Sequence, residues 1–358
     1  MVVIGGNLGY LYRGTEDAVF ASYLIRFRVD QNRANPAFVW YNMRSQRWQD
    51  FINNSKTGSA QAGANAQVLG TFLLSLPPLP EQQAIASILG SLDDLIEENR
   101  RMNETLEAMA RAIFKDWFVD FGPVRAKMEG RTPYLAPEIW DLFPDRLDDE
   151  EKPVGWEFYA LKQLTSYLSR GLSPKYVEND GVLVLNQKCI RNNAVDFTKA
   201  RRHDHTLKCI NGRELLIGDI LVNSTGVGTL GRVAQILHLP EPTTADSHIT
   251  VVRASSPVTP NFLGLALLGR QDQIEALGEG STGQTELSRI QLGNLLILLP
   301  STETILQFDL ITKPLRSQFS LNLLGNELLA SVRDFLLPKL ISGEIRVRDA
   351  EQLITEAV

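Results

Sequence analysis

The sequence predicts an α+β protein in which two related α/β domains, the first of them incomplete, are separated by two long helices that pair as an antiparallel coiled coil. Three observations predict this fold. Apolar residues recur at steps of three and four in two separate stretches, which is typical of coiled-coil helices. Strand-like and glycine-rich segments precede each stretch. The two halves of the chain also share local sequence at an offset of about 223 residues.

The first long helix is predicted from Gln82 to Phe118, within a segment that covers residues 77–121. Prolines precede it and Gly122-Pro123 follows it, and both stop helices. An ordinary core helix is the alternative, but a seam sustained for about four heptads usually needs a partner helix. The predicted seam consists of Ile85, Ile88, Leu92, Leu95, Asn99, Met102, Leu106, Met109 and Ile113.

The partner helix is predicted in the same chain, within residues 301–343. Its seam is weaker, because polar or small residues interrupt it and Pro314 predicts a kink. We expect the two helices to pack antiparallel, with Asn99 and Asn322 near their midpoints lying close together and fixing the register. The apolar seam residues of this second helix are Phe308, Ile311, Leu315, Leu329, Val332 and Leu336.

The segments around the helices are predicted to form two domains that resemble each other. In the first, Asn35-Pro36 begins a helix, and in the second, Thr259-Pro260 does the same. Thr71–Leu76 is predicted as an apolar strand that precedes the first long helix. The predicted boundaries are 1–76 for the partial first domain, 122–154 for an acidic, proline-rich connector, 155–300 for the second domain and 344–358 for a tail or short strand.

The repeat predicts that the first domain is incomplete. Gly6–Gly9 matches Gly228–Gly231, but the part of the second domain from Gly155 to about Leu221 has no counterpart before Met1. A truncated gene, a misassigned start codon and a recombining cassette all remain open as causes. We expect Met1–Leu76 to be poorly ordered, because the missing strands would leave sheet edges and apolar faces uncovered.

Composition favours a soluble, cytoplasmic protein. The 358 residues are 44% hydrophobic, contain no long apolar run that could span a membrane and begin with no signal peptide. Two cysteines do not make a disulfide framework. The net charge is −6, but acidic residues concentrate on the first long helix and the connector, whereas basic residues cluster between Lys188 and Arg213. Such a local basic patch is what contacts to phosphate require.

Three other motifs have weaker interpretations. Gly226–Gly231 fits G-x-G-x-x-G, but strand-like sequence follows where a dinucleotide site needs a helix, so a tight turn between strands is predicted. Asn35–Phe38 is read as a helix start rather than a methyltransferase catalytic motif. No metal site or cofactor is predicted, because the following residues lack zinc-ligand spacing, and the histidines among them are read as surface or phosphate contacts: Cys189, His203, His205 and Cys209.

Three stretches together resemble the specificity subunits of type I restriction-modification systems. Pro77–Ala86, with the helix through Asn99 and on to Ala112–Phe114, looks like the central conserved region of that family. Leu336–Ile345 looks like its distal conserved region. Leu215–Val222 with Gly226–Val233 looks like the core of a target-recognition domain. The resemblance covers the chain almost end to end.

The resemblance implies a non-catalytic DNA-recognition subunit. Each target-recognition domain would read half of a bipartite site in double-stranded DNA, and the paired helices would set the gap between the half-sites. The helices would also dock two methyltransferase subunits, and restriction subunits would join that complex. The alternatives are a DNA methyltransferase or nuclease with fused recognition domains, a structural coiled-coil adaptor, and a non-functional truncated specificity subunit.

Candidate DNA contacts follow from the basic patch and the glycine turn, because loops on a strand scaffold commonly carry such contacts. We expect phosphate contacts from Lys188, Arg191, Lys199, Arg201, Arg202 and Arg232. We expect base or backbone contacts from Ser224, Thr225, Thr229, Gln284 and Thr285. No catalytic residue is predicted.

Overall fold

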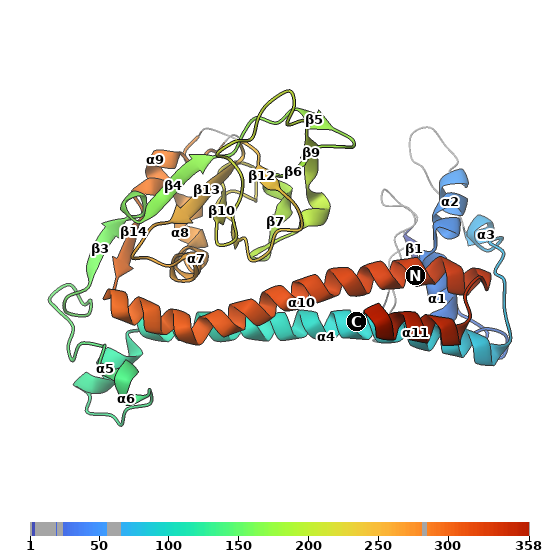
Figure 1. Cartoon of the computed structure of the whole chain (residues 1–358), viewed down its shortest axis with the longest axis horizontal. Coiled ribbons are helices and arrows are strands. Elements are labelled where there is room, and N and C mark those ends of the chain that lie inside the picture. Colours follow the sequence, from blue (N-terminus) through green and yellow to red (C-terminus); the bar gives the residue numbers. More distant parts are fainter. Residues whose placement is uncertain (1, 4–18, 20–23, 56–65, 281–284, 358) are drawn as a thin grey trace. The chain divides into compact units, whose positions relative to one another are not determined.

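The computed structural model describes residues 2–3, 19, 24–55, 66–280 and 285–357. The chain divides into two compact units, residues 102–321 and residues 1–101 with 322–358. Each unit contains part of both long helices, α4 (Leu79–Phe118) and α10 (Thr302–Ser342). The mixture of helices and sheets confirms the predicted α+β class (Figure 1).

The unit of residues 102–321 carries a domain built on two four-stranded sheets. Its strands are β3 (Glu157–Ala160), β4 (Thr165–Arg170), β5 (Tyr176–Val177), β6 (Val182–Leu185), β7 (Ile190–Arg191), β8 (Ala194–Val195), β9 (Arg201–His203), β10 (Ile220–Asn223), β11 (Val233–Gln235), β12 (Thr243–Ala245), β13 (Ile249–Ala254) and β14 (Leu296–Leu299). Its helices are α5 (Gly122–Met128), α6 (Pro137–Trp140), α7 (Pro260–Leu268), α8 (Gln271–Ala276) and α9 (Arg289–Gly293), with 3-10 turns η1 (Leu161–Gln163), η2 (Gln187–Cys189) and η3 (Phe197–Lys199).

The first sheet has the antiparallel order β11-β10-β13-β4, with Leu221 opposite Val251. The second has the order β12-β6-β9-β5, in which only β12 and β6 are parallel. The hairpin β7-β8 and the antiparallel pair β14-β3, whose strands lie far apart in sequence, complete the pairing in this unit. The central strands are buried and rich in branched side chains, which favours strands over helices.

Aromatic side chains join this domain to the long helices. Phe262 on α7 packs against Phe114 and Phe118 on α4, with ring centroids 5.5 and 5.0 Å apart. Phe308 on α10 lies 5.1 Å from the Phe118 ring. All four rings are buried, and such pairs add to the stabilisation from area burial. The domain is therefore fixed to its own segment of the helix pair.

The other unit consists of α1 (Pro36–Arg44), α2 (Gln46–Asn54), α3 (Ala66–Leu69), α11 (Val347–Ala357) and its parts of α4 and α10, with the short pair β1 (Val2–Val3) and β2 (Leu24–Ile25). Asn35 caps α1 by accepting from the amides of Ala37 and Phe38. Phe38 is fully buried against α4 and α10, as its counterpart Phe262 is in the other unit. The matched helix starts at Asn35 and Thr259 thus each place a buried phenylalanine against the long helices of their own unit.

The long helices run antiparallel in each unit, as predicted. In one unit Asn99 pairs with Asn326, and in the other the Asn103 amide donates to the Phe319 carbonyl at 3.3 Å. Helix α10 continues through Pro314 without interruption, and Gly343 ends it with a φ of 76°.

The predicted seam of α4 is wrong at three of its nine positions. Leu95, Met102 and Met109 are 45%, 43% and 48% exposed, whereas Ile96 and Ala110 are buried. The reason is that α4 packs against a domain helix as well as against α10. Its buried face therefore differs from the seam expected for a pair of helices alone. The seam of α10 is correct at Phe308, Leu329 and Leu336, which are all buried.

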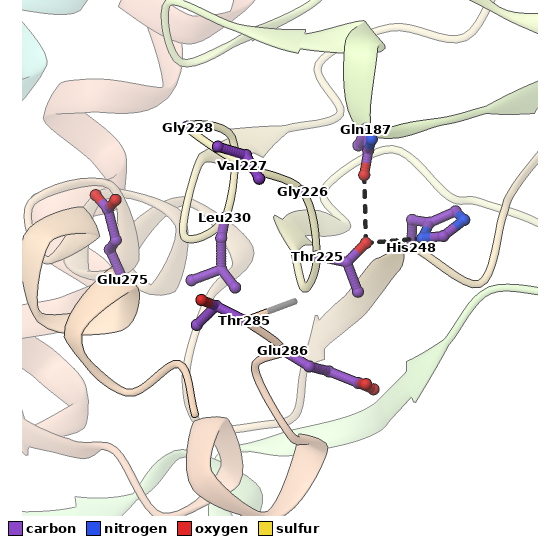
Figure 2. Close-up of a pocket in the computed structure, with 10 residues that line it drawn as sticks. All are labelled: Gln187, Thr225, Gly226, Val227, Gly228, Leu230, His248, Glu275, Thr285 and Glu286. Atoms are coloured by element: carbon purple, nitrogen blue, oxygen red, sulfur yellow. Dashed lines mark hydrogen bonds between the residues drawn. The ribbon is translucent and has the colours of Figure 1, made fainter. Parts of the chain in front are cut away.

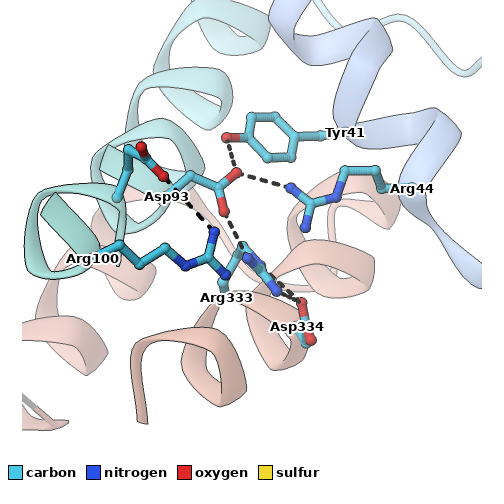
Figure 3. Close-up of polar contacts among 7 residues, drawn as sticks. Tyr41, Arg44, Asp93, Arg100, Arg333 and Asp334 are labelled. Atoms are coloured by element: carbon cyan, nitrogen blue, oxygen red, sulfur yellow. Dashed lines mark hydrogen bonds and ion pairs between the residues drawn. The ribbon is translucent and has the colours of Figure 1, made fainter. Parts of the chain in front are cut away.

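A charged cluster centred on Asp93 ties three helices together in the first-domain unit (Figure 3). Its carboxylate accepts from the Tyr41 hydroxyl and Arg44 on α1 at 2.8 and 2.9 Å, and from Arg333 on α10 at 2.7 Å. Burial raises the pKa of Asp93, but the hydrogen bonds from Arg333 and Tyr41 and the charge of Arg44 outweigh it, so the pKa is lowered. The cluster therefore holds the carboxylate ionised.

Thr71–Leu76 and the tail differ from their predictions, and the connector contains two helices that were not predicted from the sequence. Thr71–Leu76 forms no strand but runs as irregular chain into α4. The connector contains α5 and α6, and Trp140 of α6 is buried. The tail forms α11, whose buried Ala350 packs against the core of α1, α4 and α10. Each segment is too short for its periodicity to be decisive, so tertiary contacts determined its structure.

Candidate nucleic-acid interface

The glycine turn lies between β10 and β11, as predicted, and its backbone needs its glycines. Gly226, Gly228 and Gly231 have φ values of 107°, 68° and 80°. A Cβ on Gly226 would lie 2.8 Å from the Gln187 amide oxygen, and one on Gly231 would lie 2.8 Å from the Glu275 backbone. The Leu230 amide donates to the Gly226 carbonyl at 3.0 Å. The turn is thus tightly held against its neighbours.

A positively charged recess lies on one side of this turn. Arg191 and Arg232, far apart in sequence, line the same cavity of about 370 Å³ with Asn192, Asn193 and Gln271. No acidic side chain is among these lining residues. Two guanidinium groups with neighbouring amides make a suitable environment for a phosphate. We call this cavity the arginine recess.

The arginine recess is held in place by a hydrogen-bonded brace. Asn192 and Asn193 form the turn of the β7-β8 hairpin with φ values of 49° and 61°. The Gln271 amide donates to the Asn193 side chain at 2.6 Å, and its oxygen accepts from the Val233 amide at 2.8 Å. Arg232 donates to the Gly228 carbonyl at 2.7 Å. The fold therefore positions the Arg232 side chain and the hairpin that carries Arg191.

A larger recess of about 670 Å³ is lined by the turn itself (Figure 2). Thr225 forms hydrogen bonds there with Gln187 at 3.2 Å and His248 at 2.7 Å. Thr285 lines the same recess and is exposed. The structure thus brings two predicted contacts, Thr225 and Thr285, to one cavity. Sequence reasoning missed Gln187 and His248, since nothing local marks them.

The other predicted contacts divide by exposure. Lys188 and Lys199 are exposed. Arg201 is exposed and its guanidinium lies 3.3 Å above the Tyr176 ring centre, a cation–π contact that orients it. Thr229 is half-buried, and its hydroxyl is 3.4 Å from the Thr225 carbonyl.

Three predicted surface or DNA-contact residues are buried or already paired with other groups of the protein. Arg202 makes two hydrogen bonds with Glu241 at 3.0 and 2.7 Å, so its charge is already paired. Ser224 is fully buried and its hydroxyl lies 2.6 Å from that of Thr250. His203 is also buried, with Nε2 2.8 Å from the Lys208 carbonyl. Predicted contact Gln284 lies outside the described residues.

Within the described ranges, no group of three or more His, Cys, Asp or Glu residues is arranged to hold a metal ion. Burial raises the pKa of the Cys189 thiol to about 11, which disfavours the thiolate that a metal would need. Among the same residues, no helix has the length and apolarity to cross a membrane.

Comparisons with known proteins agree with this architecture. Residues 1–108 match the family model described as the type I restriction modification DNA specificity domain. The chain is 26% identical to the type I restriction enzyme MjaIX specificity subunit of Methanocaldococcus jannaschii, over 87% of this chain and 69% of that one. It is 25% identical to the HindI specificity subunit of Haemophilus influenzae, over 95% and 84%.

A solved structure shares the fold. The crystal structure of the type I restriction-modification S subunit from M. genitalium superposes with a TM-score of 0.52 at 16% identity, covering 95% of this chain and 81% of that one. In sequence and in fold, this chain is similar to the specificity subunits of type I restriction-modification systems.

Proposed function

We propose that this chain binds a bipartite site in double-stranded DNA and selects it for the enzymatic subunits of its complex. The observation that carries the proposal is the arginine recess, where Arg191 and Arg232 meet without an acidic neighbour among the lining residues. Exposed cations at Lys188, Lys199 and Arg201 extend the positive charge of the same domain. Contacts of this kind supply most of the sequence-independent affinity for DNA.

Each segment of the chain has its own part in the proposed function. Residues 155–300 would read one half-site, and residues 1–76 would contribute to the other. The helices in segments 77–121 and 301–343 would act as the spacer, while the 122–154 connector joins them to the second domain and 344–358 completes the chain. The antiparallel packing in each unit supports a rigid spacer, because paired helices resist bending better than one.

Docking of two methyltransferase subunits, and of restriction subunits through them, is the second part of the proposal. In the unit of residues 102–321, Met102, Met109 and Leu310 are 43%, 48% and 64% exposed. In the other unit, Leu328 and Phe335 are 46% and 54% exposed on α10. Apolar side chains that a helix pair leaves uncovered are suited to contact further helices of a partner.

The test is DNA binding by the full chain assembled with its methyltransferase subunits. A duplex pool with a random region would be selected on wild type, and affinity for selected and unrelated duplexes would be measured across salt concentrations. Arg191→Ala with Arg232→Ala should weaken binding to both and lower the salt slope by roughly 1–2. Arg289→Ala, an exposed arginine of α9, is the control and should change neither. If the double variant keeps affinity and slope, the interface lies elsewhere.

A further inference from the structure

Gln187, Thr225 and His248 form a hydrogen-bonded chain at the edge of the larger recess (Figure 2). The residues come from three elements: Gln187 begins η2, Thr225 follows β10, and His248 precedes β13. The Thr225 hydroxyl lies 3.2 Å from the Gln187 amide oxygen and 2.7 Å from His248 Nδ1. This chain is separate from the arginine recess, although both border the same glycine turn.

The placement of the Gln187 oxygen against the Thr225 hydroxyl sets the direction of this hydrogen-bonded chain. The Thr225 hydroxyl has one proton, and it donates that proton to the Gln187 oxygen. His248 Nδ1 must then carry a proton and donate to the hydroxyl. The amide of Gln187 is consequently held with its oxygen toward Thr225 and its NH2 group turned away from that contact.

The backbone of Gln187 is fixed as well. The buried Asn223 side chain donates to the Gln187 carbonyl at 3.0 Å, and Asn186 caps η2 through the Lys188 amide at 2.9 Å. Gly226 leaves room for the side chain, because a Cβ there would lie 2.8 Å from the amide oxygen. The hydrogen-bonded residues thus specify one position and one orientation for the planar amide of Gln187.

That amide retains unused hydrogen-bonding capacity. In the part of the chain that the structure describes, the Gln187 NH2 group has no hydrogen-bond partner, and its oxygen has a second lone pair. Gln187 is partly exposed and lines the recess. A preorganised donor and acceptor side by side match adenine, whose major-groove edge offers the N7 acceptor and the N6 donor. Guanine offers two acceptors there and lacks the matching donor.

We infer that Gln187 reads an adenine in the half-site of the second domain, donating to N7 and accepting from N6, with Thr225 and His248 as its positioning residues. The inference rests on the proposed DNA-recognition function. It adds a specificity-determining residue that the basic patch does not contain, since phosphate contacts position a protein on DNA without selecting its sequence.

The test uses the full chain with its methyltransferase subunits and the duplex selected above. Each adenine of the half-site is replaced in turn by 7-deazaadenine, which lacks N7, and by purine, which lacks the N6 amino group. Wild type should lose roughly 5- to 150-fold in affinity at one adenine, the range of one bidentate base contact. Gln187→Ala should bind the unmodified duplex correspondingly less well and show no further loss with either analogue at that adenine.

The positioning role has its own controls. Thr225→Val removes the hydroxyl and should abolish the loss of affinity that the two analogues cause at that adenine. Thr225→Ser keeps a hydroxyl and should show that loss again. Thr206→Val, which removes an exposed hydroxyl that donates to Asp204, should leave the affinity losses caused by the analogues unchanged. Unchanged thermal melting in the Gln187 and Thr225 variants excludes a general loss of fold.

Two outcomes would overturn the inference. If Gln187→Ala binds the selected duplex with the wild-type analogue profile, another residue reads the adenine and the DNA-recognition function stands. If no adenine in the half-site responds to either analogue, Gln187 does not read adenine by its N7 and N6 groups. Failure to select any sequence from the random pool would instead refute the proposed function itself.

Discussion

The side-chain amide of Asn99 on α4 donates to the side-chain oxygen of Asn326 on α10 at 2.9 Å. The sequence repeat matches Asn99 with Asn322, which is buried one turn before Asn326. A hydrogen bond between polar seam residues favours one register of two antiparallel helices, because a shift of either helix would separate the amides. Asn322 as a register residue remains a prediction.

The Asn99–Asn326 pair should show energetic coupling. Asn99→Ala and Asn326→Ala should each destabilise the protein, and the double variant should be less destabilised than their sum by about 1 kcal/mol. Chemical denaturation of the four proteins measures this coupling. Glu104→Ala, an exposed position on the same helix, serves as the control and should stay within ~0.5 kcal/mol of wild type. Additive single effects would show that the amides do not interact in solution.

Neighbouring residues test the buried face of α4. Ile96 is 6% exposed and Leu95 is 45% exposed. Ile96→Ala should therefore cost about 2–4 kcal/mol through lost burial and a cavity, whereas Leu95→Ala should cost less than about 1 kcal/mol. Denaturant unfolding compares the two directly. If Leu95→Ala lost more stability than Ile96→Ala, Leu95 would lie in the buried seam as the heptad pattern predicts.

The charge of Asp93 should contribute to stability in a pH-dependent way. Its folded-state pKa lies below the ordinary value of 3.8, so its contribution is present above that value and is lost as the pH falls through the lower folded pKa. Asp93→Asn should cost about 1–3 kcal/mol at neutral pH, because Arg44 and Arg333 lose their anion. The difference from wild type should shrink below about pH 4.

The measurement for Asp93 is the free energy of unfolding of wild type and Asp93→Asn as a function of pH. Asp94→Asn is the matched control, since Asp94 is the exposed neighbour on the same helix. A difference between wild type and Asp93→Asn that stays constant from neutral to acid pH would argue against the ion cluster.

Arg201 and Arg202 should separate into a DNA contact and a structural residue. Arg201→Ala should weaken binding to all duplexes and lower the salt slope by about 0.9, which is the change expected for the loss of one phosphate contact. Arg202→Ala should leave the slope unchanged and slightly lower the melting temperature, because Arg202 is already paired with Glu241. Titration of labelled duplex at several salt concentrations distinguishes them. A loss of slope in Arg202→Ala would mean that DNA displaces Glu241.

Much of the fold could be predicted because the signals are long or chemically specific. The long helices carry many apolar repeats, and the N-caps Asn35 and Thr259, each followed by proline, begin α1 and α7 as expected. Gly226–Gly231 was correctly predicted as a turn, since the sequence after it favours β11. By contrast, Thr71–Leu76 offered only a short apolar run, which does not distinguish a strand from irregular chain.

The candidate site could be predicted only in part. Basic residues in sequence mark a region of positive charge, but they do not show which are already paired. Arg201 and Arg202 are neighbours in sequence, but Glu241, from a distant loop, pairs with Arg202, whereas Arg201 lies over the Tyr176 ring. Gln187 carried no local signal, because its role depends on Thr225 and His248 from other elements.

The sequence by itself determined the two long helices, their antiparallel partnership, the repeat and the resemblance to type I specificity subunits, because each rests on local periodicity or on residues adjacent in the chain. The tertiary structure decided which face of α4 is buried, which arginines remain unpaired and which side chains meet at the glycine turn. These depend on contacts between residues such as Arg191 and Arg232, which only folding brings to one recess. Burial and pairing are properties of neighbours in space, so spacing along the chain alone does not fix them.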